Sequence, residues 1–267
     1  MAMRDTPLET IQQQLAHRLL RAGLVSRPEN KALATYNRLM NATVRDCLEG
    51  IYPRTTQRVL RWLDTTGSQP ARAWKALAEE YRRNFPNPSY RLVEAVAHFP
   101  EFLARQDKLV TAHPHLVDLA QLEWADCVVR HAPNPLRPEA SAEGDIPAPA
   151  GWTEASPVWN TACALLALDY PVAGEETPVA QSTLYCVYRD PDTLATRTLT
   201  VNPLTMAVLQ QGMVNPTPTY AALLNQLIET QPALTTLPRQ SVTDQLLGLF
   251  TTLRDQRILL GSSPPHS

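Results

Sequence analysis

The sequence predicts an α+β fold, with an N-terminal all-α helical domain and a small winged-helix-like C-terminal domain of a β-hairpin and three helices. In the first half, apolar residues recur at three- and four-residue steps, which is typical of amphipathic helices. Near residue 190, two runs rich in Val, Tyr and Thr flank a turn sequence, which indicates a hairpin. Residues 132–151 contain five prolines and almost no large apolar residue. We therefore expect a helical domain at residues 1–131, a linker at 132–151 and a second domain at 152–267.

Composition and charge limit the classes of protein to consider. The 267 residues are 44% hydrophobic, which is enough for one large or two ordinary globular domains. No apolar run approaches the roughly 18 residues of a membrane span, and the charged start MAMRDTPLET lacks a signal core, so we expect a cytoplasmic protein without a membrane segment. Through His131 there are 18 Lys and Arg against 14 Asp and Glu, a net charge of +4, and the remaining 6 against 12 give −6. An acidic second half disfavours binding to nucleic acid phosphates.

Start and stop signals divide the first half into helices. Thr6-Pro7-Leu8-Glu9 is typical of a helix N-terminus, and Gly23 ends this first helix. A second start at residues 26–29 opens a long helix that ends near Gly50. A further helix is predicted from Pro70 to Asn84, after which prolines break the chain into short helical pieces.

The stretch from Pro114 to Arg130 predicts a central helix, because apolar residues occupy nearly all of its circumference. Glu123 falls inside its buried stripe and needs a partner, since an unpaired buried charge is very costly. A structural ion pair with an arginine or tyrosine of an upstream helix is favoured over a catalytic acid.

No pattern indicates a catalytic or metal site of the chain's own. The sequence lacks a glycine-rich phosphate loop and a G-x-S-x-G elbow, and its four cysteines stand too far apart for zinc spacing. His113 and His115 are close in sequence, but no carboxylate or cysteine is placed to complete a metal site with them. Basic residues recur at helical spacing at Arg54, Arg58 and Arg61, without the dense cluster that DNA affinity requires. A solvated face or a docking surface for an acidic protein explains this stripe better.

The second half predicts strands followed by helices. Residues 157–172 fit a buried strand, although periodicity alone does not exclude a helix. Ser182–Arg189 and Leu194–Val201 form the hairpin around the turn Asp190-Pro191-Asp192-Thr193. Three helices follow at Pro203–Gln211, capped by Asn202, at Pro218–Thr230, capped by Thr217, and at Ser241–Arg257, and the final ILL is a candidate closing strand.

A winged-helix-like domain can read DNA or bind a peptide. A DNA-reading last helix would carry Arg, Lys, Asn or Gln toward the bases, and this helix is poorly suited to that. A peptide binder adds an extended peptide to the hairpin edge and packs its side chains against the last helix. This interpretation assigns the edge to Thr196, Thr198 and Thr200 and the apolar floor to Leu246, Leu249 and Phe250. Two alternatives stay open: the edge is only solvated, or some of the helix residues belong to the core.

Several short motifs, in this order and spacing, resemble one bacterial family over nearly the whole chain. The helical half of that family carries an old label of a DNA-binding domain. The motifs are Tyr36-Asn37-Arg38, Ile51-Tyr52-Pro53, Tyr81 to Asn87, HFPEFLA at His98–Ala104, LAQLEWA at Leu119–Ala125, and SPVWNTACALLALDYPV before the hairpin.

The resemblance implies a partner subunit of a multinuclear non-haem iron-dependent oxidative enzyme that modifies ribosomally made peptides, as in methanobactin-type and thiaglutamate-type pathways. It implies that the iron belongs to a TIM-barrel-like partner, and that this chain has no cofactor and captures the leader of a precursor peptide to present a cysteine or another reactive residue. A DNA-binding transcription regulator and a bare scaffold are the alternatives. Salt-sensitive DNA binding would favour the regulator, and absence of peptide binding would favour the scaffold.

Overall fold

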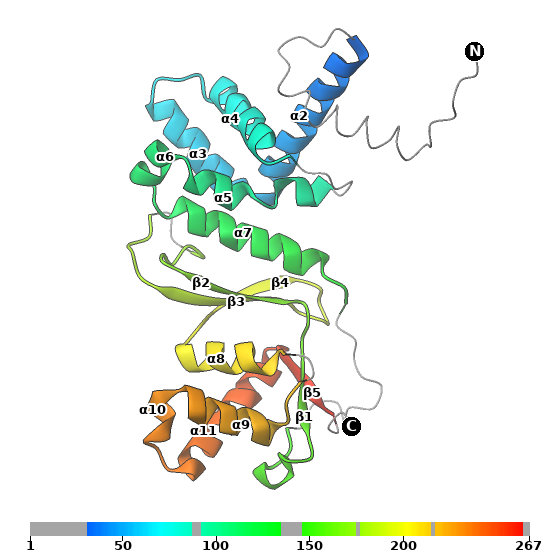
Figure 1. Ribbon diagram of the computed structural model, residues 1–267, viewed down its shortest axis with the longest axis vertical. Helices are drawn as coiled ribbons and strands as arrows, with labels where there is room; N and C mark the ends of the chain where they lie inside the picture. Colours follow the sequence, from blue (N-terminus) through cyan, green and yellow to red (C-terminus); the bar gives the residue numbers. More distant parts are fainter. Residues whose placement is uncertain (1–30, 87–91, 135–145, 175–176, 215–216, 264–267) are drawn as a thin grey trace, which may run out of the picture. The chain divides into compact units, whose positions relative to one another are not determined.

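The protein combines a helical N-terminal region with a small C-terminal domain of strands and helices, as the sequence predicts (Figure 1). The computed structural model describes residues 31–86, 92–134, 146–174, 177–214 and 217–263. The chain divides into two compact units, of which the first ends at Trp124 and the second begins at Ala125. This division falls inside one helix. No helix among the described residues has the length and apolar character required to cross a membrane.

The first unit is built from helices whose bounds agree closely with the sequence analysis. The second predicted helix, the one from Pro70 to Asn84, the short pieces and the central helix are all present. The first predicted helix, at residues 6–23, lies outside the described residues. The helices are α2 (Lys31–Ile51), α3 (Pro53–Thr65), α4 (Pro70–Asn84), the 3-10 helix η2 (Leu92–Val96), α5 (Phe99–Ala104), α6 (Asp107–Ala112) and α7 (Leu116–His131).

An aromatic cluster forms the centre of this first unit. The ring of Phe99 lies 5.0 Å from that of Tyr52 and 5.6 Å from that of Tyr81, measured between centroids. Both tyrosines are fully buried, and each needs a hydrogen-bond acceptor for its hydroxyl. Tyr52 donates to the carbonyl of Val96 at 2.7 Å and Tyr81 to that of Ala95 at 2.9 Å. The α2–α3 junction and α4 are therefore hydrogen-bonded to the η2 turn, and both pack against Phe99 of α5.

The described residues of the second unit form two antiparallel sheets. The predicted hairpin is confirmed as β3 (Thr183–Arg189) and β4 (Thr196–Val201), and β2 (Cys163–Leu168) completes a three-stranded sheet in the order β2-β3-β4. The predicted closing strand is also present, as β5 (Leu259–Ser263), which pairs with β1 (Ser156–Trp159) in a two-stranded sheet.

The prediction of one buried strand across residues 157–172 is wrong, because this stretch forms β1 and β2 in different sheets. Asn160 separates them. Its side chain is fully buried, accepts a hydrogen bond from the amide of Ala162 at 3.0 Å, and donates to the carbonyls of Arg189 at 2.8 Å and Arg257 at 3.1 Å. A buried amide satisfied by distant carbonyls fixes a sharp change of direction where apolar periodicity suggests continuity.

The chain after β4 is mainly helical. The side chain of Asn202 caps α8 as predicted, accepting from the amide of Thr205 at 2.8 Å. The predicted cap at Thr217 is wrong, because the next helix begins later and its N-cap is Thr219, which accepts from the amide of Ala222. The last predicted helix begins two residues earlier than expected. The helices are η3 (Pro149–Gly151), α8 (Pro203–Gly212), α9 (Tyr220–Thr230), the short α10 (Pro232–Thr235) and α11 (Arg239–Asp255).

Phe250 of α11 lies at the centre of the second hydrophobic core. Its ring centroid lies 5.0 Å from that of Tyr220, 5.8 Å from that of Trp152 and 6.5 Å from that of Trp159. Burial raises the pKa of Tyr220 to about 12, and its hydroxyl lies 2.9 Å from Oγ of Ser262. The core therefore joins α9 and α11 to β1 and β5.

The close packing of α8 against Trp159 gives a test of this core. A Cβ added at Gly212 would lie 2.5 Å from Cζ2 of Trp159, so Gly212→Ala forces the buried indole to move. We expect a loss of about 1–3 kcal/mol in the free energy of unfolding, measured by urea denaturation. Gly248→Ala in α11 is the matched control, because nothing lies within 4 Å of its added Cβ and alanine favours the helix by about 0.5–1 kcal/mol. Equal stability of both variants and the wild type would contradict this packing.

Candidate functional site

Strand β4 forms one margin of the three-stranded sheet, and no other strand of the described residues pairs with it there. Its register fixes which backbone groups point outward. The amide of Asp190 donates to the carbonyl of Ala195 at 2.9 Å, so this pair bonds across the hairpin. In an antiparallel ladder the bonded pairs alternate, and Arg197, Leu199 and Val201 therefore bond to β3. The N–H and C=O groups that face away from the sheet belong to Thr196, Thr198 and Thr200.

The three threonine side chains share one face of the sheet, as predicted. On that face β3 presents Tyr185 and Val187, which are fully buried, whereas Thr198 and Thr200 are exposed. Thr196 is partly buried and its hydroxyl donates to the carboxylate of Asp126 in α7. Coverage of this face therefore reaches β4 only at Thr196, and the rest of the edge strand presents outward backbone groups and small polar side chains.

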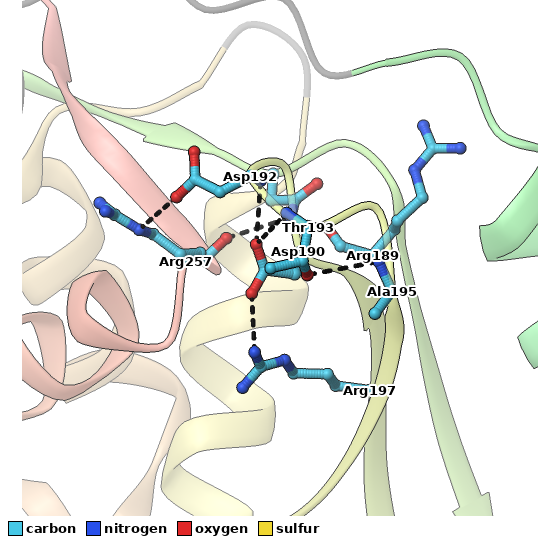
Figure 2. A network of polar contacts seen from close by, with 8 residues as sticks. Arg189, Asp190, Asp192, Thr193, Ala195, Arg197 and Arg257 are labelled. Carbon is cyan, nitrogen blue, oxygen red and sulfur yellow. Dashed lines mark hydrogen bonds and ion pairs between the residues drawn. The ribbon is translucent and has the colours of Figure 1, made fainter.

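The turn before β4 is held by the carboxylate of Asp190 (Figure 2). One oxygen accepts hydrogen bonds from the amides of Asp192 at 2.9 Å and Thr193 at 3.2 Å, and the other forms an ion pair with Arg197 at 3.0 Å. Burial alone would raise the pKa of Asp190, but the two amides and the Arg197 charge outweigh it and hold this pKa below its ordinary value. Because the folded pKa is lowered, this contribution to stability is present at neutral pH and is lost as the pH falls through the folded pKa.

Arg189, at the end of β3, joins the sheet to the C-terminus of α7. Its side chain is buried and donates to the carbonyls of Arg130 at 2.8 Å and Pro133 at 2.9 Å, and to Oδ1 of Asn134 at 3.0 Å. A guanidinium at a helix C-terminus satisfies free carbonyls and interacts favourably with the helix dipole. Sequence reasoning did not find this role, because the carbonyl partners lie more than 50 residues away.

The residues predicted as an apolar floor lie in α11. Leu246 and Phe250 are fully buried in the core of the second unit, whereas Leu249 is partly buried against it. Leu199 and Val201 of β4 pack against the same core. The face of β4 opposite the threonines therefore shares a hydrophobic core with α11, and direct contact between these leucines or Phe250 and a peptide stays a prediction.

Glu123 accepts hydrogen bonds at the N-terminus of a helix, a partner that the sequence analysis did not predict. Its two carboxylate oxygens accept hydrogen bonds from the amides of Arg54 at 2.8 Å and Thr55 at 3.1 Å, and from the Thr55 hydroxyl at 2.7 Å. These amides lie in the first turn of α3, whose own N-cap residue, Tyr52, makes no side-chain cap. A carboxylate at a helix N-terminus satisfies free amides and interacts favourably with the dipole.

The two histidines beside α7 differ in their surroundings. Burial, with the charges of Arg58 and His113, lowers the pKa of His115 to about 4, so this imidazole is neutral at pH 7. The ring centroids of His113 and His115 lie 6.0 Å apart. Across the ranges that the structure describes, no three His, Cys, Asp or Glu side chains form a group that could hold a metal ion.

The comparison with protein families concerns the sheet and the helices that follow it. The family model described as the HvfC C-terminal domain matches residues 160–254, which include β2, β3, β4 and most of α11. No curated protein matches the chain significantly. At the level of the family, the match supports the resemblance that the short motifs indicate. It covers the part of the chain that contains the β4 edge.

Replacing Glu123 tests its role as the cap of α3. Glu123→Ala leaves the amides of Arg54 and Thr55 without their buried acceptor, and we expect a loss of about 2–3 kcal/mol in the free energy of unfolding by urea titration. Burial raises the pKa of Glu123 despite these hydrogen bonds. The wild type should therefore lose stability relative to Glu123→Gln as the pH rises past the ordinary glutamate pKa, because the unfolded chain releases its proton first. An unchanged urea midpoint in Glu123→Ala would contradict the capping role.

Proposed function

We propose that the chain is a non-catalytic accessory subunit that binds the leader region of a ribosomal precursor peptide and presents it to a multinuclear non-haem iron-dependent oxidative enzyme. Two observations support this function: residues 160–254 are similar to the HvfC C-terminal domain, and the open edge of β4 lies inside this segment. HvfC-type proteins act as partners of such enzymes in ribosomal peptide modification. The iron and the redox chemistry belong to the partner in this proposal, and the modified residue is a cysteine.

The β4 edge is suited to peptide capture by strand addition. Thr196, Thr198 and Thr200 each direct one N–H and one C=O outward, so an extended peptide can add as a fourth strand with regular backbone hydrogen bonds. Backbone recognition tolerates varied leader sequences, and the threonine side chains and Arg197 then select among them. The edge is held firmly, because the Asp190 turn fixes the start of β4 and the other face of the strand packs on the core.

Presentation explains how a subunit without catalytic groups contributes to a reaction. Holding the leader on a subunit that is itself bound to the iron enzyme makes the encounter of the reactive residue with the metal effectively intramolecular. The rate then depends on the length of peptide between the leader and the reactive residue. The weak affinity of the core peptide for the metal site becomes less important.

Thr198→Pro tests the edge directly. Proline removes an outward N–H, leaves the β3–β4 ladder intact and blocks an incoming strand, and edge strands tolerate proline. We expect at least about a tenfold loss of affinity for a synthetic leader of the precursor encoded beside this chain, measured by calorimetry. Thr198→Val keeps the N–H and is the matched control that should bind as the wild type does. If Thr198→Pro has wild-type circular dichroism and wild-type affinity, the β4 assignment is wrong.

Co-purification tests the partner. The chain is co-expressed with the adjacent iron-enzyme candidate, purified through a tag on this chain alone, and the eluate is assayed for iron and protein ratio. We expect an iron-containing protein in fixed stoichiometry, because the chain acts as a subunit of the complex. Elution of the chain alone and free of iron would contradict the partner-subunit function and favour the regulator or scaffold alternatives.

A further inference from the structure

Strand β2 forms the opposite margin of the same sheet and also has an open edge. The amide of Arg189 donates to the carbonyl of Ala162 at 2.9 Å, so by alternation Ala164, Leu166 and Leu168 bond to β3. The residues whose N–H and C=O groups point away from the sheet are Cys163, Leu165 and Ala167. In the part of the chain that the structure describes, no strand pairs with β2 on this side.

The composition of β2 leaves this edge unprotected. The strand reads CALLAL, with no charge, proline or glycine, and its register with β3 runs without a bulge. Its side chains are partly buried as far as Leu166, and Ala167 is exposed. Strand β4 carries Arg197 and three threonines instead. Natural proteins normally protect edge strands with charges, prolines, bulges or a covering element, because a regular apolar edge pairs readily with another strand.

We infer that β2 pairs antiparallel with β2 of a second copy of this chain, about a twofold axis at Leu165. In this register Leu165 lies opposite its own counterpart, and Cys163 lies opposite Ala167 of the second copy. On the other face, Ala164 lies opposite Leu166 of the second copy, so Leu165 is the position of β2 at which two large side chains face each other. All three outward-facing residues are used, and the shifted registers that also pair such residues leave at least one of them without a partner.

Charge and symmetry favour a second copy over another strand. Strand β2 carries no charged side chain, so two copies of it approach without like-charge repulsion, whereas β4 carries Arg197. A twofold axis makes the contact self-complementary and closed, so it ends at a dimer. The dimer has one continuous six-stranded sheet, and both of its outer margins are β4. This inference uses a different margin from the proposed peptide site, and each can therefore fail without the other.

The mass of the full-length chain in solution tests the inference. Sedimentation equilibrium of the purified wild type should give twice the chain mass at micromolar concentrations. Leu165→Pro removes an outward N–H from each copy and should raise the dimer dissociation constant at least about tenfold. Thr198→Pro is the matched control, because it places the same substitution at the equivalent outward position of the other margin and should leave the dimer intact.

A second variant keeps the test decisive if Leu165→Pro does not fold. Ala167→Lys places a charge on an exposed residue of the β2 edge and should also weaken the dimer at least about tenfold, whereas Thr200→Lys on β4 should not. A monomeric wild type overturns the inference, and so does a dimer that persists in Ala167→Lys.

Discussion

The fold of the second unit depends on the buried amide of Asn160. Its side chain makes three hydrogen bonds and its backbone amide donates to the carbonyl of Ile258 at 2.8 Å, so one residue connects the β1–β2 junction, the end of β3 and the approach to β5. The side chain is fully buried, and unmaking these bonds would leave several polar groups unsatisfied in the core. The separation of the two sheets follows from this constraint.

Two residues at and just after the end of β3, Arg189 and Asp190, fix the register of the three-stranded sheet. Arg189 donates from its amide to Ala162, the residue before β2, accepts from Asn160 through its carbonyl, and bonds to the C-terminus of α7 through its guanidinium. Asp190 then holds the turn that begins β4. Because hydrogen-bonded pairs alternate along a ladder, fixing these two residues fixes every outward-facing group on both margins. A shift of one residue would place Arg197 and Leu199 at the free edge in place of the threonines.

Local signals were sufficient for much of this architecture. Helix periodicity, the Asn202 cap and the Asp190–Thr193 turn are short-range features, and the structure confirms the elements predicted from them. The cap at Thr219 is also a local feature, but two other misassigned residues depend on distant partners. Asn160 is recognisable as the break between two strands only when its contacts 29 and 97 residues away are known. Glu123 needs the helix start at Arg54, 69 residues earlier, to explain its burial. The threonine edge was predicted from composition, whereas its outward backbone groups follow only from the register.

The two margins of the sheet differ in a way that suits two different partners. A varied leader peptide requires recognition through the backbone, and β4 offers this with small polar side chains that exclude few sequences. A permanent partner of constant sequence allows matched apolar side chains, and β2 offers these without any charge. An edge that captures a transient ligand must also resist permanent pairing, which the exposed Arg197 opposes at β4. In these two proposals the same sheet combines a permanent contact with a reversible one, because β4 carries a charged residue that opposes pairing and β2 carries none.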